Sequence, residues 1–236
     1  MNLVGAPGDW SDLVESLVPD ILTLIISTWA AMPAMPTTPR EDPITEQLCR
    51  LLRMNRTSGD LPFQIHVQMV ELDPSAGEDQ GRMDIVFLPM VPREDIYFCL
   101  ECKRLNVPDN AGVRSLASEY ITHGMMRFVR GQYALRVHHG GMLGYVLDGK
   151  VPSAIQSVGS LIKKRHEELQ MQPPGHLEPS SIRSDDNRAR ETRHVRKDQP
   201  KAFLIHHMFA PSGQIVAVGK GLPAGHHAET FEGDRR

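Results

Sequence analysis

The chain has 236 residues, a formal net charge of -3 at pH 7 and three cysteines. This length suits one α/β domain with a small appendage, and the slightly acidic balance excludes nucleic-acid binding through overall charge. An odd number of cysteines, without a basic and apolar leader, predicts reduced thiols and a cytoplasmic location. The apolar segment 21–32 is shorter than the roughly 20 residues that span a bilayer, so it predicts a buried helix and no membrane association.

The N-terminal half is predicted to contain two helices followed by three strands. Residues 9–32 read as helical, with an interruption near Pro19. After a proline-rich connector, DPITEQLCRLLRM predicts a second helix, with Pro43 in the first turn where its missing N–H costs nothing. Apolar alternation then predicts strands over 63–72, 82–89 and 96–105. The short turn between the last two strands predicts a hairpin.

The C-terminal half predicts further alternation of helices and strands. The expected elements are a helix over 113–129, a strand over 140–149, a helix over 153–169, a loop over 170–190 and a final hairpin from TRHVRKD and KAFLIHHMFA. This order predicts an α/β fold, with a central mixed sheet flanked by helices. The expected organisation is an N-terminal helical extension (1–36), a main domain (37–221) and a flexible tail (222–236).

The stretch REDIYFCLECKRLN places ionisable residues at the end of an apolar strand. Strand alternation puts Glu101 and Lys103 on one face, and antiparallel pairing with the preceding strand brings Asp84 to the same end. Two carboxylates held together repel each other unless a cation lies between them, and oxygen-rich sites with open positions suit Mg²⁺. Such a metal can polarise a phosphodiester, and a neighbouring lysine can orient water or stabilise developing charge.

These residues resemble the D…ExK signature of the PD-(D/E)XK nuclease superfamily, which has the restriction-endonuclease-like fold. Asp84 and the LECK that ends the next strand carry the resemblance, and EDPITEQLCRLL resembles the E-x-x-I-T-x-x-L first helix of several branches. The similarity covers about residues 40–170. Met83 stands where the signature's name has proline, a departure that is common in the superfamily.

The resemblance implies a Mg²⁺-dependent nuclease in which Mn²⁺ can substitute. It implies that Asp84, Glu101 and the backbone carbonyl of Cys102 are metal ligands and that Lys103 is the catalytic lysine. Helical periodicity places Glu41 on the stripe that packs against the sheet, whereas Glu46 lies about 140° away from it. Glu41 is therefore predicted to reach the metal, directly or through a water.

Two further segments offer contacts to nucleic acid. In SEYITHGMMRFVRGQYA, helical spacing places Tyr120 and Arg127 on one stripe, and the arginine fork can hold a phosphate. The alternative is a packing stripe in which Arg127 caps the helix end, and Gln132 is a weaker candidate of the same type. The basic segment 183–201 contributes further candidates, Arg188, Arg190 and Arg193, which either track a phosphate backbone or lie in a solvated loop.

The sequence therefore predicts a metal-dependent nuclease that hydrolyses phosphodiester bonds, with DNA favoured over RNA. Restriction, phage defence or repair would suit such an enzyme, acting as a homodimer or as a subunit of a larger complex. The alternative is a non-catalytic module of the same fold that binds nucleic acid or a partner protein. In the plainest interpretation, Glu101 and Lys103 form only a solvated salt bridge at a strand end.

Overall fold

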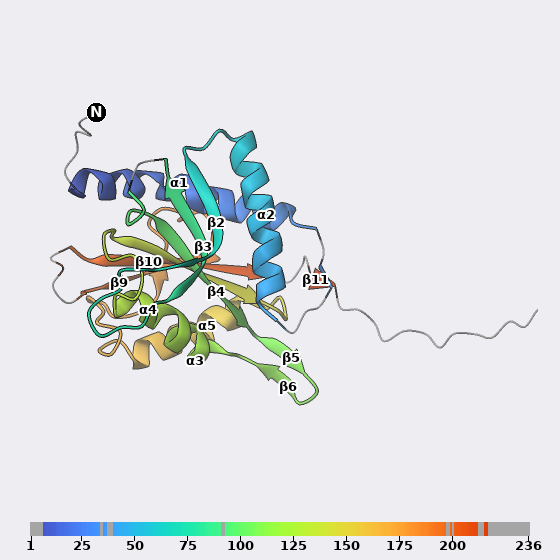
Figure 1. Cartoon of the computed structure of the whole chain (residues 1–236). Helices are drawn as coiled ribbons and strands as arrows, with labels where there is room; N and C mark the ends of the chain where they lie inside the picture. The colour runs from blue at the N-terminus through green and yellow to red at the C-terminus, as the bar shows by residue number, and fades with distance from the viewer. Residues whose placement is uncertain are drawn as a thin grey trace, which may run out of the picture.

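A seven-stranded mixed sheet forms the centre of the protein (Figure 1). The computed structural model describes residues 7–33, 35–36, 40–90, 93–196, 199, 201–211 and 215–216. The strand order is β2-β3-β4-β7-β10-β9-β8. The strands are β2 (Phe63–Val70), β3 (Arg82–Pro89), β4 (Phe98–Leu105), β7 (His139–Val146), β8 (Glu178–Pro179), β9 (Ala189–His194) and β10 (Phe203–Pro211).

The middle of this sheet is parallel and both of its edges are antiparallel. β4 pairs with β7 and β7 with β10 in parallel, whereas β2, β3 and β4 on one side and β8, β9 and β10 on the other pair antiparallel. Every residue of β7 is buried, as expected for a central parallel strand covered on both faces. Gly141 of β7 has no room for a side chain, because a Cβ there would lie 2.3 Å from Leu100.

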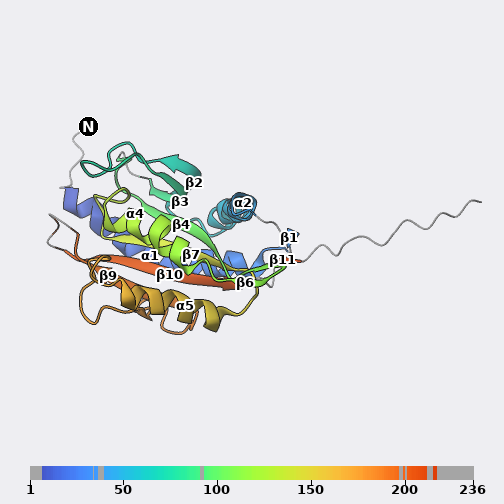
Figure 2. The same ribbon diagram turned by 90° about the horizontal axis from the view of Figure 1, so that it is seen from below.

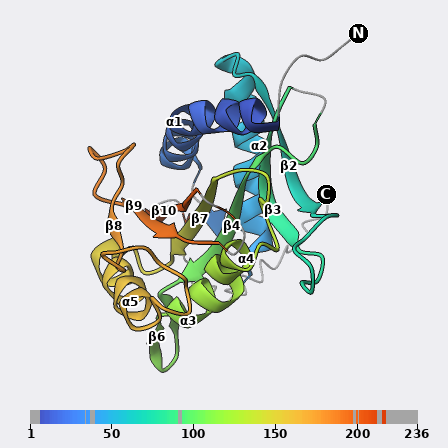
Figure 3. The ribbon, with the colours of Figure 1, turned by 90° about the vertical axis from the view of Figure 1, so that its left-hand side faces the viewer.

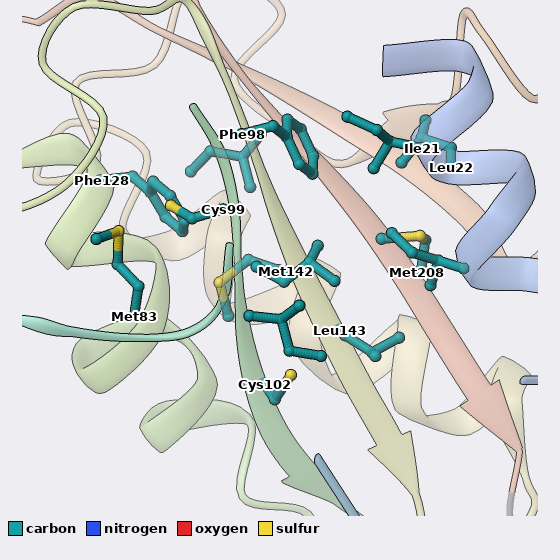
Figure 4. Close-up of a cluster of buried hydrophobic side chains, with 14 of the residues drawn as sticks. Ile21, Leu22, Met83, Phe98, Cys99, Cys102, Phe128, Met142, Leu143 and Met208 are labelled. Carbon is teal, nitrogen blue, oxygen red and sulfur yellow. The ribbon is translucent and has the colours of Figure 1, made fainter. Parts of the chain in front are cut away.

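Helices cover both faces of the sheet (Figures 2 and 3). They are α1 (Pro7–Ala31), α2 (Asp42–Ser58), α3 (Ala117–Tyr120), the π-helical turn η1 (Ile121–Met125), α4 (Met126–Val129) and α5 (Val151–Lys164). α1 lies on one face, and α3, α4 and α5 lie on the other (Figure 3). Ile21 and Leu22 of α1 accordingly lie on the opposite side of the central strands from Phe128 of α4 (Figure 4).

α1 differs from its prediction in continuity and in length. It runs through Pro19 without a break, so the predicted interruption is wrong. The Thr23 hydroxyl donates to the Pro19 carbonyl over 2.8 Å, and apolar residues on either side of the proline are anchored in the core. Its segment Trp10–Ala31 is long and apolar enough to cross a bilayer by length and composition, with half of it buried in the protein. The argument that this region is too short to span a membrane therefore fails for the helix as a whole.

The predicted helix over 113–129 begins later than expected. Val107–Asp109 (β5) and Gly112–Arg114 (β6) form a hairpin that projects from the end of β4, and helical structure starts only at Ala117 (Figure 1). The chain leaves β4 at Asn106, which has a φ of 48° and whose side-chain amide donates to Asp148 over 3.1 Å. This contact with a residue distant in sequence stabilises the turn. Local sequence patterns, which indicated a helix from residue 113, gave no sign of it.

The other predicted elements are confirmed, with small shifts of their ends. β2, β3 and β4 match the three expected strands, and β9 and β10 form the expected antiparallel hairpin. β9 starts within the predicted loop, at Ala189, and β8 adds a short edge strand there. A separate parallel pair joins β1 (Met35–Pro36) to β11 (Ile215–Val216). The predicted tail, 222–236, lies outside the described residues.

Candidate active site

The candidate site lies where β3 and β4 separate. Their ladder ends at the pair Ile85 and Leu100, and the next two residues are Asp84 and Glu101. Beyond this point, the Asp84 side chain replaces main-chain pairing, because its Oδ2 accepts the backbone N–H of Cys102 over 2.7 Å. The expected antiparallel approach of Asp84 to the end of β4 is confirmed.

Glu101 is the most deeply buried carboxylate of the site, with a relative exposure of 1%. Its Oε1 accepts hydrogen bonds from the Lys103 ammonium at 2.7 Å and from the Arg127 guanidinium at 2.9 Å. Its Oε2 is also buried but has no hydrogen-bond partner within the described part of the chain. A buried acceptor without a partner costs free energy, so this oxygen marks a position at which a ligand would be stabilising.

Lys103 connects the end of β4 to Glu41, the residue that precedes α2. Its ammonium donates to Glu41 Oε1 over 3.2 Å and to the Cys102 carbonyl over 2.8 Å, in addition to Glu101. The other oxygen of Glu41 accepts the backbone N–H of Arg104 over 3.0 Å. Glu41, Asp84, Glu101 and Lys103 therefore form one group, called the carboxylate cluster below.

The predicted difference between the two glutamates of the first helix is confirmed in position. Glu41 precedes α2 and reaches into the carboxylate cluster, whereas Glu46 is exposed and lies 3.9 Å from Arg50 on the outer surface of the helix. The helical phase of about 100° per residue accounts for this separation.

The carboxylate cluster has an excess of acidic groups in a poorly solvated place. Burial and, to a smaller extent, the neighbouring Asp84 raise the pKa of Glu101 to about 7, against the opposing effects of Lys103 and Arg127. Burial also raises the pKa values of Asp84 and Glu41, again against the effect of Lys103. Burial alone would lower the pKa of Lys103, but the three carboxylates outweigh it and hold that pKa above its ordinary value. Lys103 therefore stays protonated at neutral pH.

These oxygens fit a hard divalent cation in their chemistry. Carboxylates and a main-chain carbonyl are the ligands that Mg²⁺ prefers, and the unpartnered Glu101 oxygen offers a further acceptor. As the side chains lie, no three His, Cys, Asp or Glu residues of the described ranges are placed to hold one ion together. The Lys103 ammonium bonds to Glu41 and Glu101 and is the local counter-cation. A metal would have to displace it from at least one carboxylate.

Arg127 contacts the carboxylate cluster through Glu101. Its Nη1 donates to Glu101 and to the Tyr133 hydroxyl, at 2.9 and 2.6 Å. Gly124 in the π-turn lets this helical segment lie close to β7, because a Cβ at this position would be 2.4 Å from the methyl carbon of Met142. π-turns of this kind are frequent at functional sites.

The prediction that Tyr120 contacts nucleic acid is wrong. Its side chain is fully buried, and its hydroxyl hydrogen-bonds to Nδ1 of His207 over 2.9 Å. The predicted stripe assumed uniform α-helical spacing, but the π-turn after Tyr120 changes the phase of the residues that follow. Gln132 is half-buried and donates to the carbonyl of Asp79 over 2.8 Å, beside the site but outside the carboxylate cluster.

The three predicted arginines of the basic segment are not brought to the carboxylate cluster. β9, which contains Arg190 and Arg193, is separated from β4 by β10 and β7. Arg188 pairs with Asp186 at 2.8 Å, Arg193 pairs with Glu191 at 2.8 Å, and Arg190 donates to the carbonyl of Ala189. Because this region includes a strand of the main sheet, the solvated-loop alternative is wrong for residues 189–194.

Apart from the Cys102 carbonyl, which the family resemblance implied, the sequence analysis missed the main-chain groups of the site. The Arg104 N–H holds Glu41, and the Arg82 carbonyl accepts the Tyr133 hydroxyl over 2.5 Å. Every residue carries such groups, so no side-chain pattern could have identified them. Comparison with known proteins finds no matching family model, no matching curated protein and no matching solved structure.

Proposed function

We propose that this protein is a metal-dependent nuclease with a restriction-endonuclease-like core that hydrolyses phosphodiester bonds, DNA being favoured over RNA. The observation that carries the proposal is the buried oxygen of Glu101 at the point where β3 and β4 separate, which has no hydrogen-bond partner in the part of the chain that the structure describes. Asp84, Glu41 and Lys103 surround the same strand end. A group of acids with raised pKa values, gathered around one lysine, is costly as a purely structural device.

Asp84, Glu101 and the Cys102 carbonyl would hold Mg²⁺ or Mn²⁺, with Glu41 binding directly or through a water. When bound, such an ion polarises the phosphate and lowers the pKa of an attacking water. The raised pKa of Lys103 argues for a permanent cation that stabilises developing negative charge, and against a general base. Arg127, which shares Oε1 of Glu101 with Lys103, would orient a phosphate through its planar fork.

A second candidate function is a non-catalytic module of the same fold that binds nucleic acid or a partner protein. It is favoured by the contacts of Lys103, which bridges Glu41 and Glu101 as a structural ion network would. The two functions differ in their response to metal. A nuclease should gain thermal stability from Mg²⁺ or Mn²⁺, because an ion that binds only the folded state stabilises it, whereas the non-catalytic module should not.

The decisive experiment incubates purified protein with supercoiled plasmid, single-stranded DNA and RNA, each with Mg²⁺, Mn²⁺ or EDTA. We expect cleavage of at least one DNA substrate with Mg²⁺ or Mn²⁺ and none in EDTA. The Asp84→Asn protein is the matched control, because it keeps the size of the side chain and loses one carboxylate. Cleavage that persists in excess EDTA would refute the metal mechanism, and the absence of cleavage and of any metal-induced stabilisation would favour the non-catalytic module.

The biological setting is proposed on the family resemblance alone. A nuclease of this kind suits restriction, phage defence or repair in the cytoplasm, as a homodimer or as a subunit of a larger complex. Size-exclusion chromatography with light scattering, with and without DNA, would separate these assemblies.

A further inference from the structure

An open groove of about 410 Å³ lies on the other side of Arg127 from the carboxylate cluster. One wall is formed by η1 and α4, and the other is the loop between β2 and β3, which passes beside α4 (Figure 1). Two contacts hold this loop in place: Ser75 N–H donates to the Gly131 carbonyl over 3.0 Å, and Gln132 donates to the Asp79 carbonyl over 2.8 Å. The groove therefore has two fixed walls and begins at an arginine that touches Glu101.

The helical wall presents hydrogen-bond donors along one line. The groove is lined by Thr122 and His123 of the π-turn, by Arg127 of α4 and by Arg130 at the C-terminal end of α4. Arg165 donates to the Thr122 hydroxyl oxygen over 2.8 Å, which leaves the hydroxyl hydrogen to be donated elsewhere. This row combines two guanidinium groups with two smaller polar groups, a set that suits successive phosphates.

The opposite wall is acidic, with Glu78 and Asp79 facing the groove. These carboxylates repel an anionic ligand. The helical wall should therefore strengthen the binding of an anion, and the loop wall should weaken it. We propose that the groove, called the phosphate groove below, holds the sugar–phosphate backbone next to the bond to be cleaved. This inference rests on the proposed nuclease function. It assigns Thr122, His123 and Arg130 as substrate-positioning residues outside the metal site.

The test measures binding of short fluorescein-labelled probes, namely single-stranded DNA, duplex DNA and RNA, by anisotropy in EDTA over a range of salt concentrations. Arg130→Gln and His123→Gln should weaken binding several-fold, and Arg130→Gln should reduce the salt slope by about 1, as expected for one lost phosphate contact. Glu78→Gln should instead tighten binding. Arg50→Gln is the control, because Arg50 is an exposed arginine on the outer surface of α2, 3.9 Å from Glu46.

The outcomes separate this inference from the proposed function. If Arg130→Gln and Glu78→Gln bind the probes like wild type, the phosphate groove is refuted, and the nuclease proposal stands as long as the wild-type protein cleaves a probe with Mg²⁺ or Mn²⁺. A wild-type protein that neither binds nor cleaves any probe refutes both. Opposite shifts for Arg130→Gln and Glu78→Gln, with Arg50→Gln unchanged, support the groove, and the probe most affected identifies the strand type that it holds.

Discussion

The carboxylate cluster and the histidines of β7, β9 and β10 are both sets of polar side chains buried against the same sheet. They differ in whether the buried groups carry charge. The histidine network consists of His139, His194, His206 and His207. Each of its rings makes at least one hydrogen bond, for instance between His139 Nδ1 and His206 Nε2 at 2.9 Å. Among the described residues, Nδ1 of His206 is buried without a partner, but it belongs to a neutral ring. Burial lowers the pKa of His194 to about 4 and that of His206 to about 3, so the network is neutral.

The carboxylate cluster, in contrast, retains charge that its surroundings do not fully compensate. Three carboxyl groups with raised pKa values share one lysine and one arginine, and one oxygen of Glu101 has no partner among the described residues. A neutral, hydrogen-bonded network adds to the specificity of the fold at little cost. A charged cluster that is short of cations is destabilising without a ligand, which is why we assign function to it and a structural role to the histidines.

The largest expected effect is the loss of cleavage when a carboxylate of β3 or β4 is removed. Asp84→Asn and Glu101→Gln should each lower the cleavage rate by roughly a thousandfold or more, because the ion and the charge it stabilises are lost. Isothermal titration with Mn²⁺ should show that both variants lose metal binding, whereas Lys103→Met loses cleavage and keeps the metal. His206→Gln, the matched change in the histidine network, should lower stability and leave the rate per folded molecule unchanged. Full cleavage by Glu101→Gln would contradict the assignment.

A smaller effect is expected at the start of α2. Glu41→Gln should lower cleavage by about 10- to 100-fold, the scale for a group that supports metal ligands. Glu46→Gln, on the outside of the same helix, should have almost no effect on cleavage, because the ion pair of Glu46 with Arg50, at 3.9 Å, is exposed. Initial rates with saturating Mg²⁺ measure both. Equal rates for Glu41→Gln and wild type would leave Asp84 and Glu101 as the only side-chain ligands.

The contributions of the buried histidines and of Glu101 to the free energy of unfolding should change with pH in opposite directions. His194 and His206 stay neutral in the folded protein but bind a proton near pH 6.5 when it unfolds. Between about pH 6.5 and 4 each therefore lowers the free energy of unfolding by about 1.4 kcal/mol per unit of acidification. Glu101 has a raised pKa of about 7, so the folded state binds the extra proton, and its contribution to stability falls as pH rises from about 4.5 to 7.

Urea denaturation of metal-free protein across this pH range measures both contributions. Glu101→Gln should remove the decrease in the free energy of unfolding that the wild-type protein shows as pH rises to 7. Above pH 7 this variant should be more stable than wild type, by about 3 kcal/mol at most. His206→Gln should flatten the acid side of the profile. Saturating Mn²⁺ should stabilise the wild-type protein near pH 7.5 and leave Glu101→Gln unaffected. A Glu101→Gln protein that is less stable than wild type at pH 8 would show that its ion pairs outweigh its burial.

The smallest effect is expected in the basic segment. The triple change Arg188→Gln, Arg190→Gln and Arg193→Gln should leave the salt dependence of DNA binding unchanged, because Arg188 and Arg193 already pair with Asp186 and Glu191. Anisotropy titrations at several salt concentrations measure the slope. A slope lowered by about 2 or 3 would restore these arginines as phosphate contacts and would extend the nucleic-acid surface to β9.

The sequence by itself determined the local elements and the position of the acids along the chain. Alternation fixed which residues of β3 and β4 share a face, and helical phase separated Glu41 from Glu46. Both inferences succeeded because they depend on one periodicity within one element. The start of the helix at Ala117 and the burial of Tyr120 were missed, because a turn anchored by Asn106 to Asp148 and a π-turn interrupt the period.

Only the tertiary structure decided which charges meet. The Lys103 ammonium could have remained in solvent at a strand end, but α2 brings Glu41 to it, and Gly124 allows Arg127 to reach Glu101. The pairing of Arg188 with Asp186 likewise removed a basic surface that the sequence had suggested. Coulomb interactions depend on distances and burial that arise from packing between elements, whereas composition and spacing specify only which groups are present.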